Sequence, residues 1–206
     1  MRNRNIDIFI SGAGPAGLLA SLSFASLGYS VFCVDPKKPV TQSNEDGADL
    51  RTTAFLQPAK TFMASLGLWE KLEPFAIPME IMRIIDSEGD NWPPRETTAK
   101  DFLASEISDL PFGWNIPNWL LRRTLLENAM EYSNLELKFG LTTSSIIRRD
   151  DAAFVYLNDG SQIKSKLIIG ADGRDSLVRD KSQIKISKRE FPQKALTFIV
   201  THERPQ

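Results

Sequence analysis

A glycine-rich turn lies between two short apolar runs near the N-terminus, and it restricts the fold more than any other feature of the sequence. The runs at residues 6–10 and 31–34 are rich in β-branched and other apolar side chains, as the buried strands of a parallel sheet are. Between them, residues 16–27 are rich in alanine and leucine, and Gly28 ends the expected helix. The sequence therefore predicts a strand, a tight turn, a helix and a second strand, nearly all of it buried.

The turn at residues 12–17 reads Gly-Ala-Gly-Pro-Ala-Gly and directly follows the first strand. Gly12 permits the tight turn, Gly14 lets a pyrophosphate approach the backbone, and Gly17 allows the helix to pack closely on the strand. Pro15 and Ala16 begin a helix whose N-terminal amides face the phosphates. The pattern predicts a dinucleotide site, and by itself it does not separate FAD from NAD.

An acidic residue, Asp35, ends the second strand about twenty residues after the glycines, as in dinucleotide-binding units. A carboxylate at this place can accept hydrogen bonds from a ribose hydroxyl. Lys37 and Lys38 follow it. These lysines allow two interpretations: they could bind a 2′-phosphate, or they could be solvated surface residues. The sequence favours the second.

A second motif joins a strand to a helix through the sequence Gly-Ala-Asp-Gly. An Asp-Gly pair at the carboxyl edge of the sheet places Asp172 and Gly173 beside a bound dinucleotide. Ser176 and Arg179 lie one turn apart, on the same side of the helix that follows. The alternative is an ordinary turn in which Asp175 or Ser176 caps the helix.

A third motif, at residues 47–55, places Arg51 just before a helix that we expect over residues 52–66. From there the guanidinium can reach a phosphate or the edge of a flavin. The alternative is an exposed arginine beside Thr52, with Thr52 as the helix cap.

The remaining elements follow from apolar spacing and turn residues. Residues 119–132 predict a helix, and Asn-Asp-Gly at residues 158–160 predicts a hairpin turn. Residues 92–94 and the polar stretch after them predict a loop or an edge region. Strands are expected over residues 79–86, 135–139, 144–148, 154–157, 163–169 and 195–201.

Composition excludes several functional classes. With 25 basic and 26 acidic residues the net charge is -1, so the chain lacks the basic field of most nucleic-acid binders. One cysteine cannot form an internal disulfide, and one cysteine with one histidine argues against zinc, so no metal is expected.

The uncharged run from residue 8 to residue 34 is interrupted by glycines and a proline. It therefore predicts no membrane span or signal peptide, and a cytoplasmic protein is expected.

Taken together, these motifs resemble the class A flavoprotein monooxygenases, which have the para-hydroxybenzoate hydroxylase fold. The resemblance is carried by the glycine turn, by Arg51 in its Arg-Thr-Thr-Ala setting, and by the Asp-Gly pair with Ser176 and Arg179. Within that class the chain is most similar to the hydroxylases of ubiquinone biosynthesis, through residues 51–55, 66–69, 114–121 and 201–205.

The resemblance implies an α/β fold, with a Rossmann-like FAD-binding domain built on a mixed sheet and an incomplete antiparallel substrate-domain sheet. It implies an enzyme in which FAD, reduced by NAD(P)H, activates oxygen and passes one oxygen atom to an aromatic ring. The implied substrate is a prenylated phenol, a precursor of ubiquinone. No catalytic residue is assigned. The implied cofactor-binding residues are Gly12, Gly14, Pro15, Ala16, Gly17, Asp35, Arg51, Asn118, Asp172 and Gly173.

Asn118 departs from the family pattern, which often has Arg or Gln at this place. An asparagine can still donate one hydrogen bond to the cofactor. Arg122 or Arg123 is a candidate to replace the missing group, and the alternative is that both are solvated charges of a surface helix.

Members of this family are roughly twice as long as this chain, so we expect the N-terminal part of a hydroxylase, inactive as a fragment. Residues 1–77 and 113–184 are assigned to the FAD-binding domain. Residues 78–112 are assigned to a substrate-domain segment, and residues 185–206 to the start of a truncated substrate-domain sheet. Unpaired strands of that sheet would favour self-association.

Two other functions are compatible with the sequence. One is a complete NAD(P)-binding reductase of the Rossmann type, in which Arg51 and the Asp-Gly pair would have no role. The other is a non-catalytic scaffold of the ubiquinone pathway. The resemblance also leaves room for a ubiquinone-biosynthesis complex and for peripheral contact with the inner face of a membrane, and no nucleic-acid partner is expected.

Overall fold

The computed structural model describes residues 3–89, 94–196 and 203, and the chain divides into two compact units. The first unit is built from two stretches that are distant in sequence, Met1–Arg51 and Asn118–Gln206. The second unit is the intervening stretch, Thr52–Pro117. The expected assignment of segments to an FAD-binding and a substrate domain stays a prediction.

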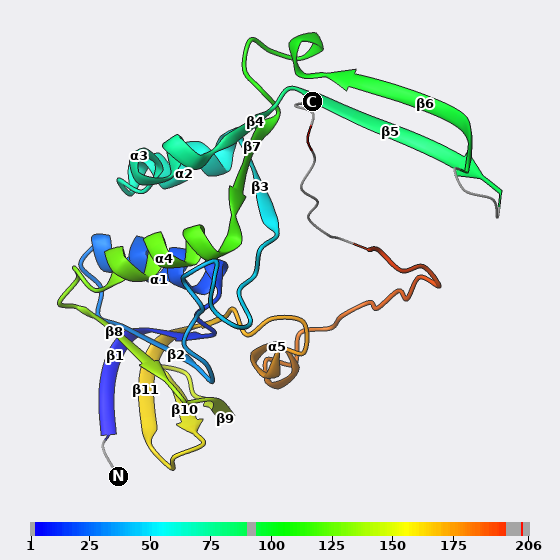
Figure 1. Ribbon diagram of the computed structural model, residues 1–206. Helices are drawn as coiled ribbons and strands as arrows, with labels where there is room; N and C mark the ends of the chain where they lie inside the picture. Colours follow the sequence, from blue (N-terminus) through cyan, green and yellow to red (C-terminus); the bar gives the residue numbers. More distant parts are fainter. Residues whose placement is uncertain (1–2, 90–93, 197–202, 204–206) are drawn as a thin grey trace. The chain divides into compact units, whose positions relative to one another are not determined.

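A six-stranded mixed sheet forms the centre of the first unit (Figure 1). Its strand order is β8-β2-β1-β11-β10-β9, in which β8, β2, β1 and β11 are mutually parallel and β10 and β9 complete an antiparallel edge. This arrangement confirms the predicted α/β class with a mixed sheet. The strands are β1 (Asn3–Ser11), β2 (Val31–Asp35), β8 (Leu135–Phe139), β9 (Thr143–Arg148), β10 (Ala153–Leu157) and β11 (Gln162–Gly170).

Two helices, α1 (Pro15–Ser26) and α4 (Asn118–Ala129), pack on each other beside this sheet (Figure 1). The helix α1 is the predicted connection between β1 and β2. It carries no charged side chain, and its buried residues are Gly17, Leu18, Ser21, Leu22 and Ala25. The helix α4 buries a run of leucines that includes Leu121 and Leu125. Together they confirm the predicted helices, with α4 beginning at Asn118 instead of Trp119.

The two faces of the sheet are covered separately, because successive side chains of a strand point to opposite faces. On one face Phe9 and Phe32 lie side by side in register, with ring centroids 6.3 Å apart, and join a cluster with Val155 and Ile163. Cys33 points to the other face and is fully buried, so burial raises the pKa of its thiol to about 12. This cysteine is therefore a small apolar core residue, as its place in a strand predicts.

The second unit contains a small antiparallel sheet, a long hairpin and two short helices. Trp69 and Trp114 meet edge to face, with ring centroids 5.4 Å apart, and the Lys60 Nζ atom lies 4.4 Å from the centroid of the Trp114 ring. The elements are β3 (Thr52–Leu56), β7 (Gly113–Pro117) and β4 (Ile77–Met79) in the order β3-β7-β4, the hairpin β5 (Ile81–Glu88) and β6 (Arg95–Leu103), the helices α2 (Gln57–Ser65) and α3 (Trp69–Leu72), and the 3-10 turns Glu73–Phe75 and Ala104–Glu106.

One predicted element of this unit is wrong, and for another the structure decides between two alternatives. Residues 52–56 form β3 and not the first turns of a helix, because they pair along their length with β7, itself a strand that the sequence analysis did not predict. The helix begins only at Gln57, where Pro58 is well placed in the first turn. The polar stretch after residue 94, predicted as a loop or an edge region, is an edge strand, because within the described residues β6 pairs only with β5 in a two-stranded sheet. The pairing shifts register once, at Asp86 and Ser87, and includes a bidentate ion pair between Arg83 and Asp101.

The last predicted strand, over residues 195–201, has no counterpart at Ala195 and Leu196, which belong to no regular element. Its remaining residues lie outside the described part of the chain. Before them, the short helix α5 (Leu177–Lys181) follows β11. Within residues 3–89 and 94–196, no helix combines the length and the apolar character that a bilayer-spanning helix needs.

Burial in α4 leads to a direct stability test. Leu125 is completely buried, whereas Met130, just after the helix, is 68% exposed. We expect Leu125→Ala to lower the free energy of unfolding by about 2–5 kcal/mol through lost burial and an unfilled cavity, and Met130→Ala to change it by less than about 0.5 kcal/mol. Urea unfolding of both variants measures the difference, and equal effects would contradict the packing described here.

Candidate cofactor-binding site

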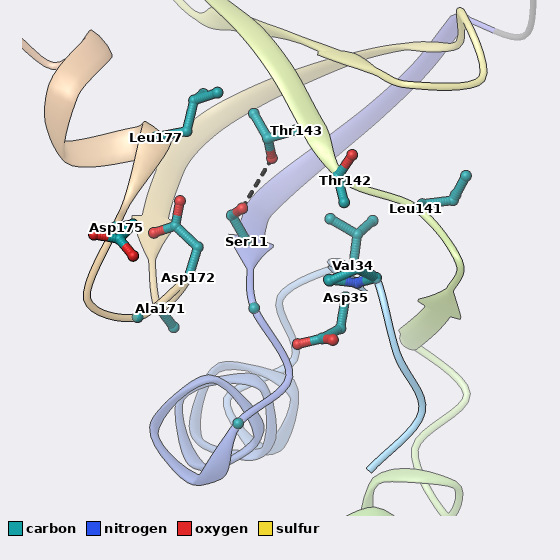
Figure 2. A pocket seen from close by; sticks show the side chains of 14 residues that line it. Ser11, Val34, Asp35, Leu141, Thr142, Thr143, Ala171, Asp172, Asp175 and Leu177 are labelled. Atoms are coloured by element: carbon teal, nitrogen blue, oxygen red, sulfur yellow. Dashed lines mark hydrogen bonds between the residues drawn. The ribbon is translucent and has the colours of Figure 1, made fainter.

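A cleft of about 410 Å³ opens at the carboxyl ends of the parallel strands in the first unit (Figure 2). The strand order reverses there, because β2 lies on one side of β1 and β11 lies on the other. Ligands of open α/β sheets bind at such a switch point. Residues of the two predicted motifs line the cleft, among them Gly12, Gly14, Asp35, Asp172 and Gly173.

The three glycines of the turn have three different steric environments. A Cβ atom on Gly12, where φ is +103°, would lie 2.2 Å from the carbonyl oxygen of Ala171, in the turn after β11. A Cβ atom on Gly17 would lie 1.9 Å from the carbonyl oxygen of Gly12. A Cβ atom on Gly14 would meet nothing within 4 Å. The chain therefore needs Gly12 and Gly17 for its own packing, whereas Gly14 keeps space open on the cleft side.

The helix α1 begins at this turn, so its positive end lies at the cleft. Gly14 is the N-cap, Pro15 is the first helical residue, and no side chain caps the helix N-terminus. An anion beside Gly14 would therefore meet backbone amides and the helix dipole without a competing carboxylate at the cap.

Asp35 holds the glycine turn in place. Its Oδ2 atom accepts a hydrogen bond from the Ala13 amide at 2.8 Å, and its Oδ1 atom accepts one from the Lys37 amide at 2.8 Å. Each carboxylate oxygen can accept a further hydrogen bond, and Asp35 lines the cleft. The position suits the ribose contact predicted from the sequence, and the contact with Ala13 adds a structural role that the sequence did not indicate.

Asp172 lies across the glycine turn from Asp35 and is also anchored (Figure 2). Its Oδ1 atom accepts a hydrogen bond from the Ser176 hydroxyl, and its Oδ2 atom accepts one from the Val178 amide at 3.1 Å. Ser176 in turn caps α5 by accepting from the Arg179 amide at 3.0 Å. The helix-cap interpretation thus holds for Ser176, and the same hydrogen bonds fix Asp172 at the cleft.

A pair of hydroxyls at the cleft is not predicted by the sequence motifs. Ser11, the last residue of β1, and Thr143, the first of β9, are both buried and share a hydrogen bond of 2.9 Å (Figure 2). The available signal for Ser11 was its place as a polar residue directly after the apolar residues 8–10 at the end of the strand. Thr143 carried none, because only the long-range order of the strands brings it to β1.

Arg51 and Asn118 meet at a carboxylate that the sequence analysis did not single out. Asp49 binds the Arg51 guanidinium through both carboxylate oxygens, at 2.8 Å to Nε and 2.9 Å to Nη2. Asn118 Nδ2 donates to the same carboxylate at 3.0 Å, and Arg122 Nη2 lies 3.4 Å from it. We name Asp49, Arg51, Asn118 and Arg122 the Asp49 cluster. Arg51 and Asn118 are not among the residues that line the cleft, and Arg51 precedes a strand and not a helix.

The Asp49 cluster strongly favours the ionised form of its carboxylate. The hydrogen bonds from Arg51 lower the pKa of Asp49 to about 2, against the opposing effect of burial, and Asn118 adds to the lowering. The Asp49 side chain is only 11% exposed. The carboxylate is therefore charged at all physiological pH values.

The chain belongs to the FAD binding domain family, because a family model of that description matches residues 5–205. Among curated proteins it is 28% identical to the ubiquinone hydroxylase UbiL of Rhodospirillum rubrum, over 96% of this chain and 44% of that protein. It is 25% identical to the 3-demethoxyubiquinol 3-hydroxylase of Escherichia coli, over 98% of this chain and 50% of that protein. The chain thus spans about half the length of the curated relatives it matches.

Solved structures of flavin-dependent monooxygenases share the fold. The flavin-dependent monooxygenase PieE, solved with FAD and substrate, superposes with a TM-score of 0.70 at 21% identity, over 89% of this chain and 33% of that one. The p-nitrophenol 4-monooxygenase PnpA of Pseudomonas putida superposes with a TM-score of 0.67 at 19% identity, over 90% of this chain and 45% of that one. The architecture is that of FAD-dependent monooxygenases, as the resemblance predicted.

The surroundings of Gly17 and Gly14 predict that substitution of the first affects folding and substitution of the second affects cofactor binding. We expect Gly17→Ala to destabilise the chain strongly, because its Cβ atom would meet the backbone of Gly12. Gly14→Ala should leave the thermal unfolding temperature within about 2 °C, since its Cβ atom enters open space, and should weaken FAD binding at least about tenfold by blocking the approach of a phosphate. Thermal melts and FAD titrations check both, and unchanged FAD affinity in Gly14→Ala would contradict this assignment.

The lowered pKa of Asp49 predicts a pH dependence of stability. The carboxylate pKa is about 2 in the folded chain and about 4 in the unfolded chain, so its contribution is fully present above about pH 4 and is lost as the pH falls toward 2. The difference in the free energy of unfolding between wild type and Asp49→Asn should therefore shrink over this interval. Urea unfolding between pH 2 and pH 6 measures it, and a difference that does not vary with pH would count against the Asp49 cluster.

Proposed function

We propose that this chain is the FAD-binding N-terminal part of an NAD(P)H-dependent monooxygenase that hydroxylates the aromatic ring of a ubiquinone precursor. One observation carries the proposal: in a chain of the FAD binding domain family, the turn at the switch point keeps open space at Gly14 while packing tightly at Gly12 and Gly17. The reaction is inferred from the relatives whose names describe ubiquinone hydroxylases.

The residues around the cleft fit the ADP half of FAD. Backbone amides at the start of α1 would hold the pyrophosphate, and Asp35 would accept from the ribose hydroxyls. Asp172 and Gly173 would lie beside the chain that leads to the flavin, with Asp172 already fixed by Ser176 and Val178. The FAD would supply the oxygen-activating redox chemistry, and the protein would bind, orient and shield it.

The second unit offers an apolar surface that suits a hydrophobic substrate. A hollow of about 700 Å³ lies within it, lined by Leu56, Ile77, Met79, Met82 and Phe112 among others. A prenylated phenol would bury its apolar groups in such a hollow. Met79, Met82 and Phe112 fall in residues 78–112, which supports the assignment of that stretch to a substrate-domain segment. Residues 1–77 and 113–184 would serve the cofactor, and Leu56 and Ile77 of the first of these stretches would also contact the substrate.

Because the chain spans about half of its relatives, we propose hydroxylation only for a protein that also holds a counterpart of their second half. Residues 185–206 would begin the sheet that this counterpart extends. A cytoplasmic location at the inner face of a membrane, and a place in a complex of ubiquinone biosynthesis, would follow from a lipid-soluble substrate. Self-association through exposed strands such as β5 and β6 would follow where that counterpart is absent.

Ligand titrations test the proposal. We expect FAD to bind the 206-residue chain at a site where ADP competes and FMN does not, because the cleft would hold the ADP half. Together with a polypeptide that corresponds to the second half of the relatives, the chain should retain FAD through gel filtration and consume NAD(P)H faster when a prenylated phenol is added. Flavin fluorescence and absorbance measure these effects.

Two outcomes would overturn the proposal. One is a chain that binds NADH tightly and shows no affinity for FAD with or without the second half, which would favour a reductase. The other is FAD-free association with proteins of the ubiquinone pathway without turnover, which would favour a scaffold. Gly14→Ala serves as the control that separates binding in the cleft from binding elsewhere.

A further inference from the structure

We propose that Asp49 is a positioning residue, which orients the Arg51 guanidinium for a phosphate of the bound FAD. The proposal rests on the FAD binding proposed above. Asp49 was not expected at the site, and its role follows from the contacts of four side chains in the first unit.

The pair between Asp49 and Arg51 is bidentate, which fixes the plane of the guanidinium as well as its position. The Asp49 side chain is 11% exposed, whereas the Arg51 side chain is 59% exposed. The carboxylate thus lies inside the unit, and the arginine extends from it toward solvent. Of the five N–H groups of an arginine side chain, the bidentate pair uses two, so the outer nitrogen Nη1 remains directed away from Asp49.

Asp49 is itself fixed to a rigid element. Asn118, the first residue of α4, is 7% exposed and donates its side-chain amide to Asp49 Oδ2 at 3.0 Å. The backbone amide of Asn118 also donates to the Arg51 carbonyl at 2.9 Å. The segment from Asp49 to Arg51 has no regular structure of its own, so these bonds to α4 hold it in one place.

The charges of the Asp49 cluster suit an anion. Two guanidiniums, Arg51 and Arg122, share one carboxylate, which leaves one positive charge in excess. A purely electrostatic role for Asp49 would weaken anion binding, because its negative charge opposes the ligand. In a positioning role Asp49 would instead strengthen anion binding, because without the carboxylate the exposed arginine would sample many rotamers. The two roles therefore predict opposite effects of removing the charge.

The chain contains a matched control for this pair. Arg83 and Asp101 form the same bidentate geometry, with both N–O distances at 2.7 Å, on the hairpin of the second unit. Asp101 is 37% exposed. It lies in neither the cleft nor the Asp49 cluster.

The test is a double-mutant cycle in FAD affinity, with Asp49→Asn, Arg51→Gln and the double variant. We expect Asp49→Asn to weaken FAD binding about tenfold although it removes a negative charge, which corresponds to one lost charge-assisted hydrogen bond. In the Arg51→Gln background the same substitution should have no further effect, because Asp49 acts through Arg51. Asp49→Glu should restore part of the affinity, and Asp101→Asn should leave it within about twofold of wild type.

A second measurement does not depend on FAD. In the ligand-free chain, the Arg51 Nε–H signal in a ¹⁵N NMR spectrum should exchange slowly with water, and it should be lost in Asp49→Asn while the backbone amide signals of α4 persist. Asp49→Glu provides the folded comparison if Asp49→Asn unfolds.

The outcomes are distinct. Equal or tighter FAD binding in Asp49→Asn, or an equal loss in the Arg51→Gln background, would overturn the positioning role. A fast-exchanging Arg51 signal in the wild-type chain would also overturn it. Absence of FAD binding in wild type, both with and without the second half of the relatives, with the Arg51 signal protected as expected, would instead refute the proposed function and leave the geometry of the Asp49 cluster intact.

Discussion

The backbone of the turn after β1 passes so close to the turn after β11 that no side chain fits between them at Gly12. This close approach joins the beginning of the first unit to the end of β11. It also brings the Asp-Gly pair beside the glycine turn, because the two turns follow parallel strands that are neighbours in register. The cleft depends on this approach, since the two turns and the end of β2 form much of its wall, which residues 141–143 and Leu177 complete.

The same contact explains how two stretches distant in sequence form one unit. The strand β1 pairs with β11 along most of its length and with β2 on its other side, and β2 then pairs with β8. The chain leaves this unit after Arg51 and returns at Asn118, and these two residues are hydrogen-bonded to each other through their backbones. Asp49 adds a side-chain link between the same two segments. The unit is thus held at the cleft and at the place where the chain leaves and returns.

Local patterns were sufficient for most of the first unit. Two apolar runs predicted β1 and β2, and the alanine-rich segment between them, which ends at a glycine, predicted α1. The hairpin turn at residues 158–160 predicted β10 and β11. They failed in the second unit for residues 52–56, which were expected at the start of a helix but pair with β7 as the strand β3. Pairing with a distant strand outweighs local propensity in such segments.

The sequence by itself determined the family and the positions of the glycine turn, Asp35 and the Asp-Gly pair at the edge of the sheet, because glycine at a turn and a carboxylate after a strand have local steric and hydrogen-bonding consequences. Only the tertiary structure decided which partners those residues have. Asp35 holds the glycine turn, Ser176 anchors Asp172, and Asp49 joins Arg51 to Asn118. These contacts are long-range or depend on the course of an irregular loop, so no spacing in the sequence specifies them. The physical reason is that a hydrogen bond depends on the final positions of two groups, whereas a motif records only their order along the chain.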